Sequence, residues 1–242
     1  MSLTLPRWFA HRGGGSLAPE NTLAGIRLAA SLGYKAVEFD VMLSGDGTPV
    51  LIHDETLERT TNGSGLVSDT PDSKLFVLDA GGGEPIPSFA EAAALCRELG
   101  LLANIEIKPA VGYETQTAQL VAELTTKLWR DAAIQPLISS FSLEALEIAR
   151  DLAPHIPRGI LFEAVPRDWL GVLQRLRAVT LHGRADLLTD AVLDEAAALH
   201  IPVLCYTVNS PKQAKILFER GVTALFTDRL DLFADETSPY KR

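Results

Sequence analysis

Cysteine is scarce in this chain, with only Cys96 and Cys205 among 242 residues. Two cysteines so far apart form neither a disulfide framework nor the paired spacing of a metal site. Each lies in apolar surroundings, the first in a predicted helix and the second in a predicted strand. We therefore predict that both are buried free thiols.

Positive charge is also in short supply. The chain has 22 Lys and Arg against 31 Asp and Glu, for a net charge of −9 and a pI near 5.1. Nucleic-acid binding draws on clustered Lys and Arg, so we expect no nucleic-acid partner. A local basic spot for a single phosphate is still compatible with this composition.

Long apolar runs are missing. No stretch is long enough to span a bilayer, and residues 1–8 lack the basic start and apolar run of a secretion signal. We expect a cytoplasmic protein without stable membrane association that acts on a small molecule.

Two common enzyme motifs are absent as well. The run His-Arg-Gly-Gly-Gly at 11–15 is not the GxGxxG of a dinucleotide-binding fold. Ser139 and Ser140 end a predicted strand without a GxSxG elbow around them, so a serine nucleophile is not expected.

Short apolar runs alternate with amphipathic stretches along the whole length, which predicts a parallel sheet with helices between its strands. Eight such units without an obvious linker favour a (β/α)8 TIM barrel, formed by one domain over 1–242. The predicted strands are 7–12, 36–43, 102–107, 137–141, 159–162, 178–182, 203–208 and 224–227. The predicted helices are 23–32, 89–99, 115–129, 143–152, 169–177, 191–200 and 212–220.

One departure from this repeat follows the second predicted strand. A short apolar run at 49–53 leads into a small polar insertion at about 54–87. Loops that leave the C-terminal ends of barrel strands build the active site, so His53 at the edge of the insertion is placed to overhang it. The glycines at 63, 65 and 81–83 indicate tight turns.

Three acids lie on neighbouring predicted strands, with Glu38 and Asp40 on the second and Glu106 on the third. Side chains alternate along a strand, so Glu38 and Asp40 point the same way. Three converging carboxylates repel one another unless a hard cation lies among them. We predict one divalent cation, Mg2+ or Ca2+, at these residues; solvated charge at strand ends is the alternative.

Two histidines, His11 and His53, also fall at the ends of strand-like stretches. In-line displacement at phosphorus benefits from one base and one acid that face each other across the phosphate. Arg12 and Lys108 would supply positive charge to the phosphoryl oxygens, and Lys108 can also pair with Glu106 or Glu38. The pattern predicts a metal-assisted phosphodiesterase.

Two further segments leave alternatives open. Residues 19–22, Pro-Glu-Asn-Thr, open the first predicted helix and either cap it or contribute to the site. Tyr206 ends the seventh predicted strand. It is either an aromatic wall for an apolar or glycerol part of the substrate or a packed barrel tyrosine.

Taken together, these motifs resemble those of the glycerophosphodiester phosphodiesterase family along almost the whole chain. The matching segments are HRGGG at 11–15, APENT at 18–22, EFDV at 38–41, HD at 53–54, LERTTNG at 57–63, NIEIKP at 104–109, SSF at 139–141, YTVN at 206–209 and TD at 227–228. The Glu-Ile-Lys-Pro and Tyr-Thr-Val-Asn segments are most similar to the bacterial cytosolic enzyme that accompanies glycerol-3-phosphate uptake.

The resemblance implies a TIM-barrel hydrolase that converts a glycerophosphodiester and water to glycerol 3-phosphate and an alcohol. It implies Glu38, Asp40 and Glu106 as ligands of Mg2+ or Ca2+, and His11 and His53 as base and acid. The family's scheme has the glycerol 2-hydroxyl attack phosphorus to give a cyclic phosphate, which water opens.

Two departures from the family pattern affect the expected substrate. The segment at 81–87 is shorter than the aromatic-containing loop of many members, which predicts looser selection of the alcohol group. Tyr206 stands where many members have tryptophan. Two rival functions remain: a lysophospholipase D acting on acylated glycerophosphodiesters, and a non-catalytic binding barrel.

Overall fold

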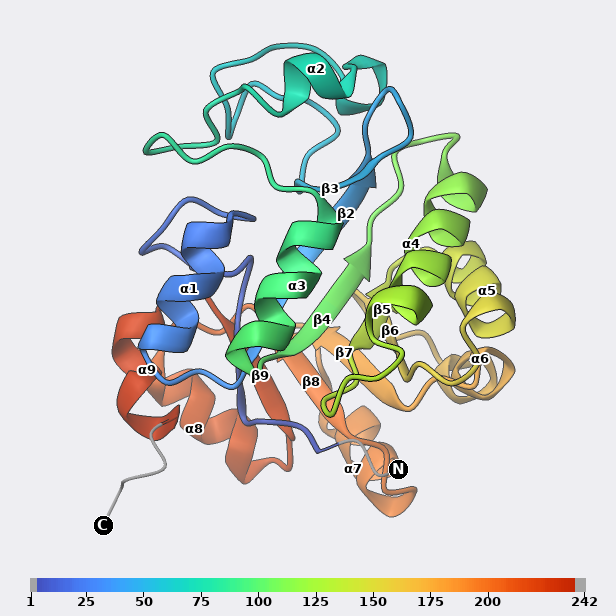
Figure 1. Ribbon diagram of the computed structural model, residues 1–242. Coiled ribbons are helices and arrows are strands. Elements are labelled where there is room, and N and C mark those ends of the chain that lie inside the picture. The colour runs from blue at the N-terminus through green and yellow to red at the C-terminus, as the bar shows by residue number, and fades with distance from the viewer. Residues whose placement is uncertain (1–3, 238–242) are drawn as a thin grey trace.

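The computed structural model describes residues 4–237, and within them eight parallel strands close into a barrel (Figure 1). Each strand pairs with its neighbours in chain order, and β1 closes the ring by pairing with both β2 and β9. The predicted (β/α)8 TIM barrel is therefore confirmed. The barrel strands are β1 (Trp8–Ala10), β2 (Ala36–Leu43), β4 (Leu102–Ile107), β5 (Leu137–Ser140), β6 (Arg158–Phe162), β7 (Thr180–Arg184), β8 (Val203–Tyr206) and β9 (Ala224–Thr227).

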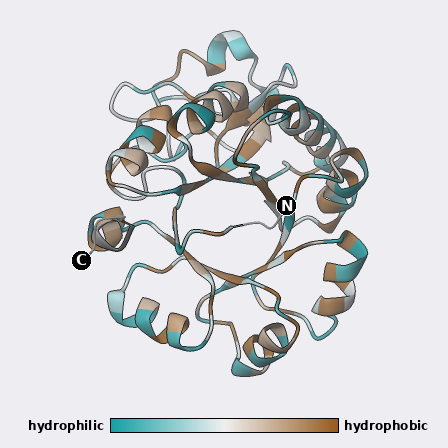
Figure 2. Ribbon diagram, turned by 60° about the horizontal axis from the view of Figure 1, so that its bottom comes forward, coloured by the Kyte–Doolittle hydropathy of each residue, from teal (hydrophilic) through white to brown (hydrophobic). Residues whose placement is uncertain are grey.

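Helices lie around the outside of these strands (Figure 2). Several begin at a side-chain cap: the Thr22 hydroxyl accepts from the Gly25 amide at the start of α1, and Ser88 forms a capping box with Glu91 at the start of α3. The helices that connect or follow the barrel strands are α1 (Leu23–Ser31), α3 (Phe89–Leu99), α4 (Glu114–Leu128), α5 (Leu143–Leu152), α6 (Trp169–Leu176), α7 (Asp190–Ala198), α8 (Pro211–Glu219) and α9 (Leu230–Thr237). Within residues 4–237, none of the helices is both long and apolar enough to cross a membrane.

The alternation of side chains along the strands divides the core into two layers. On β2, Val37, Phe39 and Val41 belong to the large cluster that packs the strands against the helices. Ala36 points the other way and joins Phe9, Leu102 and other residues of a second cluster inside the barrel. Further along β2, the inward positions are the polar Glu38 and Asp40. The barrel interior therefore changes from apolar to charged toward the C-terminal ends of the strands.

The insertion forms a small structure at that end of the barrel (Figure 1). It begins with β3 (Pro49–Leu51), which pairs antiparallel with β2, and contains the 3-10 turn η1 (Val67–Asp69) and the short helix α2 (Asp72–Leu75). Its own apolar cluster is formed by Met42, Val50, Ile52, Leu57, Val67, Leu75, Ala80 and Ile86. Positive φ angles at residues 65 and 81–83 confirm the predicted glycine turns there, whereas Gly63 has no positive φ.

Several details differ from the sequence prediction, among them the ends of β1, predicted at 7–12 and found at Trp8–Ala10, and of β8, predicted at 203–208 and found at Val203–Tyr206. Helix α9 was not predicted, and neither was α2 within the insertion. Strand β7 begins two residues later than expected, because α6 ends in a left-handed Arg177 (φ 49°) and the chain needs residues 178–179 to return to the sheet. Both cysteines are buried and free, as predicted.

Candidate active site

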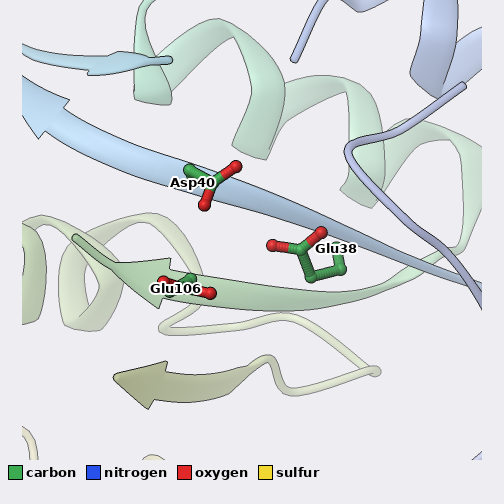
Figure 3. Close-up of side chains that lie close together, drawn as sticks. All are labelled: Glu38, Asp40 and Glu106. Carbon is green, nitrogen blue, oxygen red and sulfur yellow. The ribbon is translucent and has the colours of Figure 1, made fainter. Parts of the chain in front are cut away.

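The three acids converge at the C-terminal end of the barrel (Figure 3). Strands β2 and β4 are parallel neighbours in a register that places Asp40 opposite Glu106, with Glu38 two residues earlier on the same face. Each residue offers one carboxylate oxygen, and these oxygens lie within 4.8 Å of one another. The residues are only 4%, 2% and 9% exposed for Glu38, Asp40 and Glu106.

Three buried carboxylates this close together repel one another unless their negative charge is offset. Burial and the charge of Asp40 raise the pKa of Glu38 to about 7, and the same two causes raise the pKa of Glu106 well above its usual value. Burial acts the same way on Asp40, but the nearby Lys108, His53 and Arg12 charges outweigh it and lower the pKa of Asp40. The group needs either protons or a cation, and three oxygen donors suit a hard divalent ion. The acidic group could therefore hold a divalent metal.

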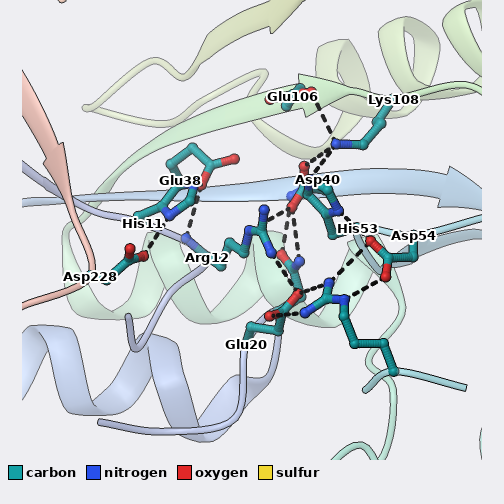
Figure 4. Close-up of polar contacts among 12 residues, drawn as sticks. His11, Arg12, Glu20, Glu38, Asp40, His53, Asp54, Glu106, Lys108 and Asp228 are labelled. Atoms are coloured by element: carbon teal, nitrogen blue, oxygen red, sulfur yellow. Dashed lines mark hydrogen bonds and ion pairs between the residues drawn. The ribbon is translucent and has the colours of Figure 1, made fainter. Parts of the chain in front are cut away.

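His11 lies on one side of the carboxylates, just after β1 (Figure 4). Its Nδ1 is hydrogen-bonded to Asp228 Oδ1 at 2.7 Å, and its Nε2 lies 3.8 Å from Glu38 Oε2. Asn209 holds Asp228 in turn, through its side-chain amide to Oδ2 at 2.9 Å and by accepting the Asp228 backbone N–H at 2.8 Å. Burial lowers the pKa of His11, but the Asp228 hydrogen bond and the Glu38 charge outweigh burial, so the pKa lies above its usual value.

His53 lies on the other side, at the start of the insertion. Its Nδ1 is hydrogen-bonded to Asp54 Oδ1 at 2.6 Å, and its Nε2 is 2.6 Å from Lys108 Nζ. Lys108 is also 3.5 Å from Asp40 and 3.8 Å from Glu106, so its predicted pairing with Glu106 is present and a second pairing is added. Burial lowers the pKa of His53 more than Asp40 and Asp54 raise it. Each histidine therefore has an aspartate behind it.

Arg12 is held between these two sides in a left-handed backbone conformation, with φ 49°. Its backbone N–H donates to Glu38 Oε2 at 2.9 Å, and its Nη1 donates to Glu20 Oε1 at 2.9 Å. Its buried Nε is 3.8 Å from Asp40 Oδ2 and has no hydrogen-bond partner among residues 4–237. The guanidinium therefore keeps donor capacity beside the carboxylates.

The glycines after Arg12 let the loop pack closely against its own chain. A Cβ at Gly15 would lie 2.3 Å from the Asp228 carbonyl oxygen, and a Cβ at Gly14 would lie 2.6 Å from Ala18 Cβ. These close contacts bring the β1 loop beside Asp228, the residue that holds His11.

Tyr206 lies on β8 with its hydroxyl donating to the Phe162 carbonyl at 2.8 Å. Its ring meets Phe141 edge to face, with ring centroids 5.9 Å apart. These contacts make it a packed barrel tyrosine that is still partly exposed. An additional role against the substrate stays a prediction.

The Pro-Glu-Asn-Thr segment does more than cap α1. Asn21, with φ 57°, donates to Asp40 Oδ2 at 2.9 Å and accepts the Asp40 backbone N–H at 3.1 Å. Glu20 binds Arg12 and also Arg59 of the insertion. Sequence reasoning left the role of Glu20 and Asn21 open, and it gave none to Asp228, Asn209, Asp54 or Arg59. The available signal was position, because Asp228 directly follows the last strand and Asp54 directly follows His53.

The fold and site define a barrel hydrolase with two aspartate-backed histidines around a buried acidic centre. Residues 11–232 match the model of the glycerophosphoryl diester phosphodiesterase family. The chain belongs to this family.

The similarity to known proteins extends along nearly the whole length of this chain. A glycerophosphodiester phosphodiesterase of Caldanaerobacter subterraneus is 32% identical over 231 residues, which are 90% of this chain and 92% of the relative. The structure of a phosphodiesterase from Oleispira antarctica, in complex with the product sn-glycerol-3-phosphate, has a TM-score of 0.90 and 36% identity, and covers 96% of each chain. A glycerophosphodiester phosphodiesterase structure from Agrobacterium tumefaciens has a TM-score of 0.81 and 27% identity, and covers 96% of this chain and all of the other.

Proposed function

We propose that this enzyme hydrolyses glycerophosphodiesters to glycerol 3-phosphate and an alcohol, in a metal-dependent reaction that uses two histidines. The observation that carries the proposal is the placement of His11 and His53 on opposite sides of the buried carboxylates, each hydrogen-bonded to an aspartate. Family membership supports the reaction, and so does the product sn-glycerol-3-phosphate in the Oleispira antarctica structure.

Glu38, Asp40 and Glu106 would hold one divalent cation, Mg2+ or Ca2+. When bound, such a cation acts as a Lewis acid on a phosphoryl oxygen and offsets negative charge in the transition state. Asn21 accepts the Asp40 backbone N–H and donates one hydrogen bond that orients the Asp40 carboxylate. The Arg12 backbone N–H does the same for Glu38.

His11 takes the proton of the attacking glycerol 2-hydroxyl, and His53 protonates the oxygen of the departing alcohol; the roles reverse when water opens the cyclic phosphate. Asp228 and Asp54 each accept an Nδ1 hydrogen bond, so Nε2 is the nitrogen of each histidine that would transfer protons. On His53 this nitrogen also contacts Lys108 Nζ at 2.6 Å.

Positive charge for the phosphoryl oxygens comes from Arg12, a planar donor with an unpartnered Nε, and Lys108, a point charge. Tyr206 would offer its exposed ring surface to the glycerol or the alcohol part of the substrate.

The ester bond that breaks is the direct test of this reaction. With glycerophosphocholine, 31P NMR should show glycerol 3-phosphate as the final phosphorus-containing product. Phosphocholine would mean that the other ester bond is cleaved and would contradict the proposal. A parallel assay with an acylated glycerophosphocholine separates the lysophospholipase D alternative, which requires faster turnover of the acylated substrate.

A further inference from the structure

Arg59, in the insertion, binds two carboxylates that come from different loops, those of Asp54 and Glu20. Figure 4 labels both acids. It donates to Asp54 from Nε at 2.5 Å and from Nη2 at 3.1 Å. It also donates to both Glu20 oxygens, from Nη1 and Nη2, each at 2.8 Å. Glu20 lies in the loop between β1 and α1, so one guanidinium joins that loop to the insertion.

Each of these carboxylates has a second partner that faces the acidic centre. Glu20 Oε1 also accepts from Arg12 Nη1 at 2.9 Å. Asp54 Oδ1 is also hydrogen-bonded to His53 Nδ1 at 2.6 Å. The contacts therefore run without a break from Arg12 through Glu20, Arg59 and Asp54 to His53. Arg59 is the middle of this series.

The geometry of the contacts requires arginine. A planar guanidinium can pair two N–H groups with each of two carboxylates at once, whereas an ammonium is a single point charge. The Arg59 side chain is 47% exposed, and an isolated ion pair at such a site stabilises a protein little. The contribution we expect from Arg59 is therefore orientation of its partners, with only a small effect on stability.

We propose that Arg59 is a positioning residue that holds His53 and Arg12 in place beside the acidic centre by binding Asp54 and Glu20 simultaneously. The proposal rests on the proposed function for its kinetic consequences. With Asp54 fixed, the Nδ1 proton of His53 has a constant acceptor and Nε2 stays directed at the site, where it meets Lys108 at 2.6 Å. With Glu20 fixed, the guanidinium of Arg12 stays beside Asp40.

The chain offers a matched control for this proposal. Arg184 is 40% exposed, lies at the end of β7, and also joins two carboxylates, Asp186 at 2.8 Å and Glu163 at 3.2 Å. Neither of those acids is bonded to His11 or His53 in the described part of the chain. Arg184→Ala therefore removes a comparable surface arginine without touching the proposed positioning contacts.

Kinetics of Arg59→Ala, Arg59→Lys and Arg184→Ala on glycerophosphocholine test the proposal. Misplacement of reacting groups by about 1 Å costs up to ~10²-fold in rate, so we expect kcat of both Arg59 variants to fall by ~10- to 100-fold, with a smaller change in KM. Millimolar guanidinium chloride should restore part of the lost kcat in Arg59→Ala and none in Arg59→Lys. Arg184→Ala should stay near the wild type, and thermal melting should confirm that all three variants fold.

A second readout does not depend on turnover. Nitrogen-15 NMR of the histidine rings should show the His53 Nδ1–H as a slowly exchanging, hydrogen-bonded proton in the wild type and in Arg184→Ala, and as a faster-exchanging proton in Arg59→Ala, because Asp54 is no longer held. Unchanged exchange of this proton together with wild-type kcat in Arg59→Ala would overturn the proposal. If the wild type itself released no glycerol 3-phosphate, the proposed function would fail, while the exchange measurement would still decide the role of Arg59.

Discussion

Replacement of His11 or His53 by alanine is expected to lower kcat/KM on glycerophosphocholine by at least ~10²-fold in each case, the usual contribution of a general acid or base. The reason is geometric. His11 binds Asp228 through Nδ1 and directs Nε2 at Glu38 of the acidic centre. His53 binds Asp54 through Nδ1 and directs Nε2 at the Lys108 ammonium beside that centre.

His155→Ala is the control for these variants. His155 is exposed and lies in the loop between α5 and β6, at the end of the barrel opposite the site. Steady-state rates of the three variants, measured at equal metal concentration, give the comparison. Near-normal turnover in either His11→Ala or His53→Ala would rule out the assigned acid and base pair.

Replacement of Asp40 by asparagine should remove most of the activity as well. Burial raises the pKa of Asp40, but the Lys108, His53 and Arg12 charges outweigh burial and lower it, whereas the pKa values of Glu38 and Glu106 are raised. Asp40 is therefore the acid of the cluster that most favours the charged form. Loss of ~3 kcal/mol of electrostatic transition-state stabilisation corresponds to more than ~10²-fold in rate. Asp186→Asn, an exposed substitution of the same chemistry on the rim, should leave the rate unchanged.

Calorimetric titration with Mg2+ and Ca2+ separates loss of the cation from loss of fold in Asp40→Asn. The same titration should show that the affinity for the cation depends on pH, in a direction that follows from the pKa of Glu38. The pKa of Glu38 is raised to about 7, so below that pH a proton must leave before a cation binds. Wild-type affinity should therefore fall from about pH 8 to about pH 6. Equal affinity at both values, or wild-type affinity in Asp40→Asn, would contradict a cation site at these carboxylates.

The barrel and the convergence of the acids could be predicted from the sequence. The barrel follows from the repeated alternation of strand and helix, and the convergence follows from the two-residue alternation of side chains along a strand. Alternation along β2 places Glu38 and Asp40 on one face, and the parallel order of strands brings Glu106 beside them. The same reasoning placed His11, Arg12, His53 and Lys108 at the correct end of the barrel, because that end follows from the direction of each strand.

The residues that hold these groups could not be predicted in the same way. Asp228 is 217 positions from His11, and Arg59 is 39 positions from Glu20, so their contacts depend on how loops fold over the barrel end. No short period relates residues in different loops. The left-handed turn at Arg12, which aims its backbone N–H at Glu38, likewise depends on tertiary packing in a non-glycine residue.

The most direct measurement is release of glycerol 3-phosphate from glycerophosphocholine by the purified wild-type protein, in a coupled assay with Mg2+, with Ca2+ and with EDTA. We predict release with at least one of the two cations and none after chelation, with activity restored when the cation is added back. Release that continues unchanged in EDTA would contradict metal dependence. No release under any of the three conditions would contradict the proposed reaction and favour the lysolipid or non-catalytic alternative.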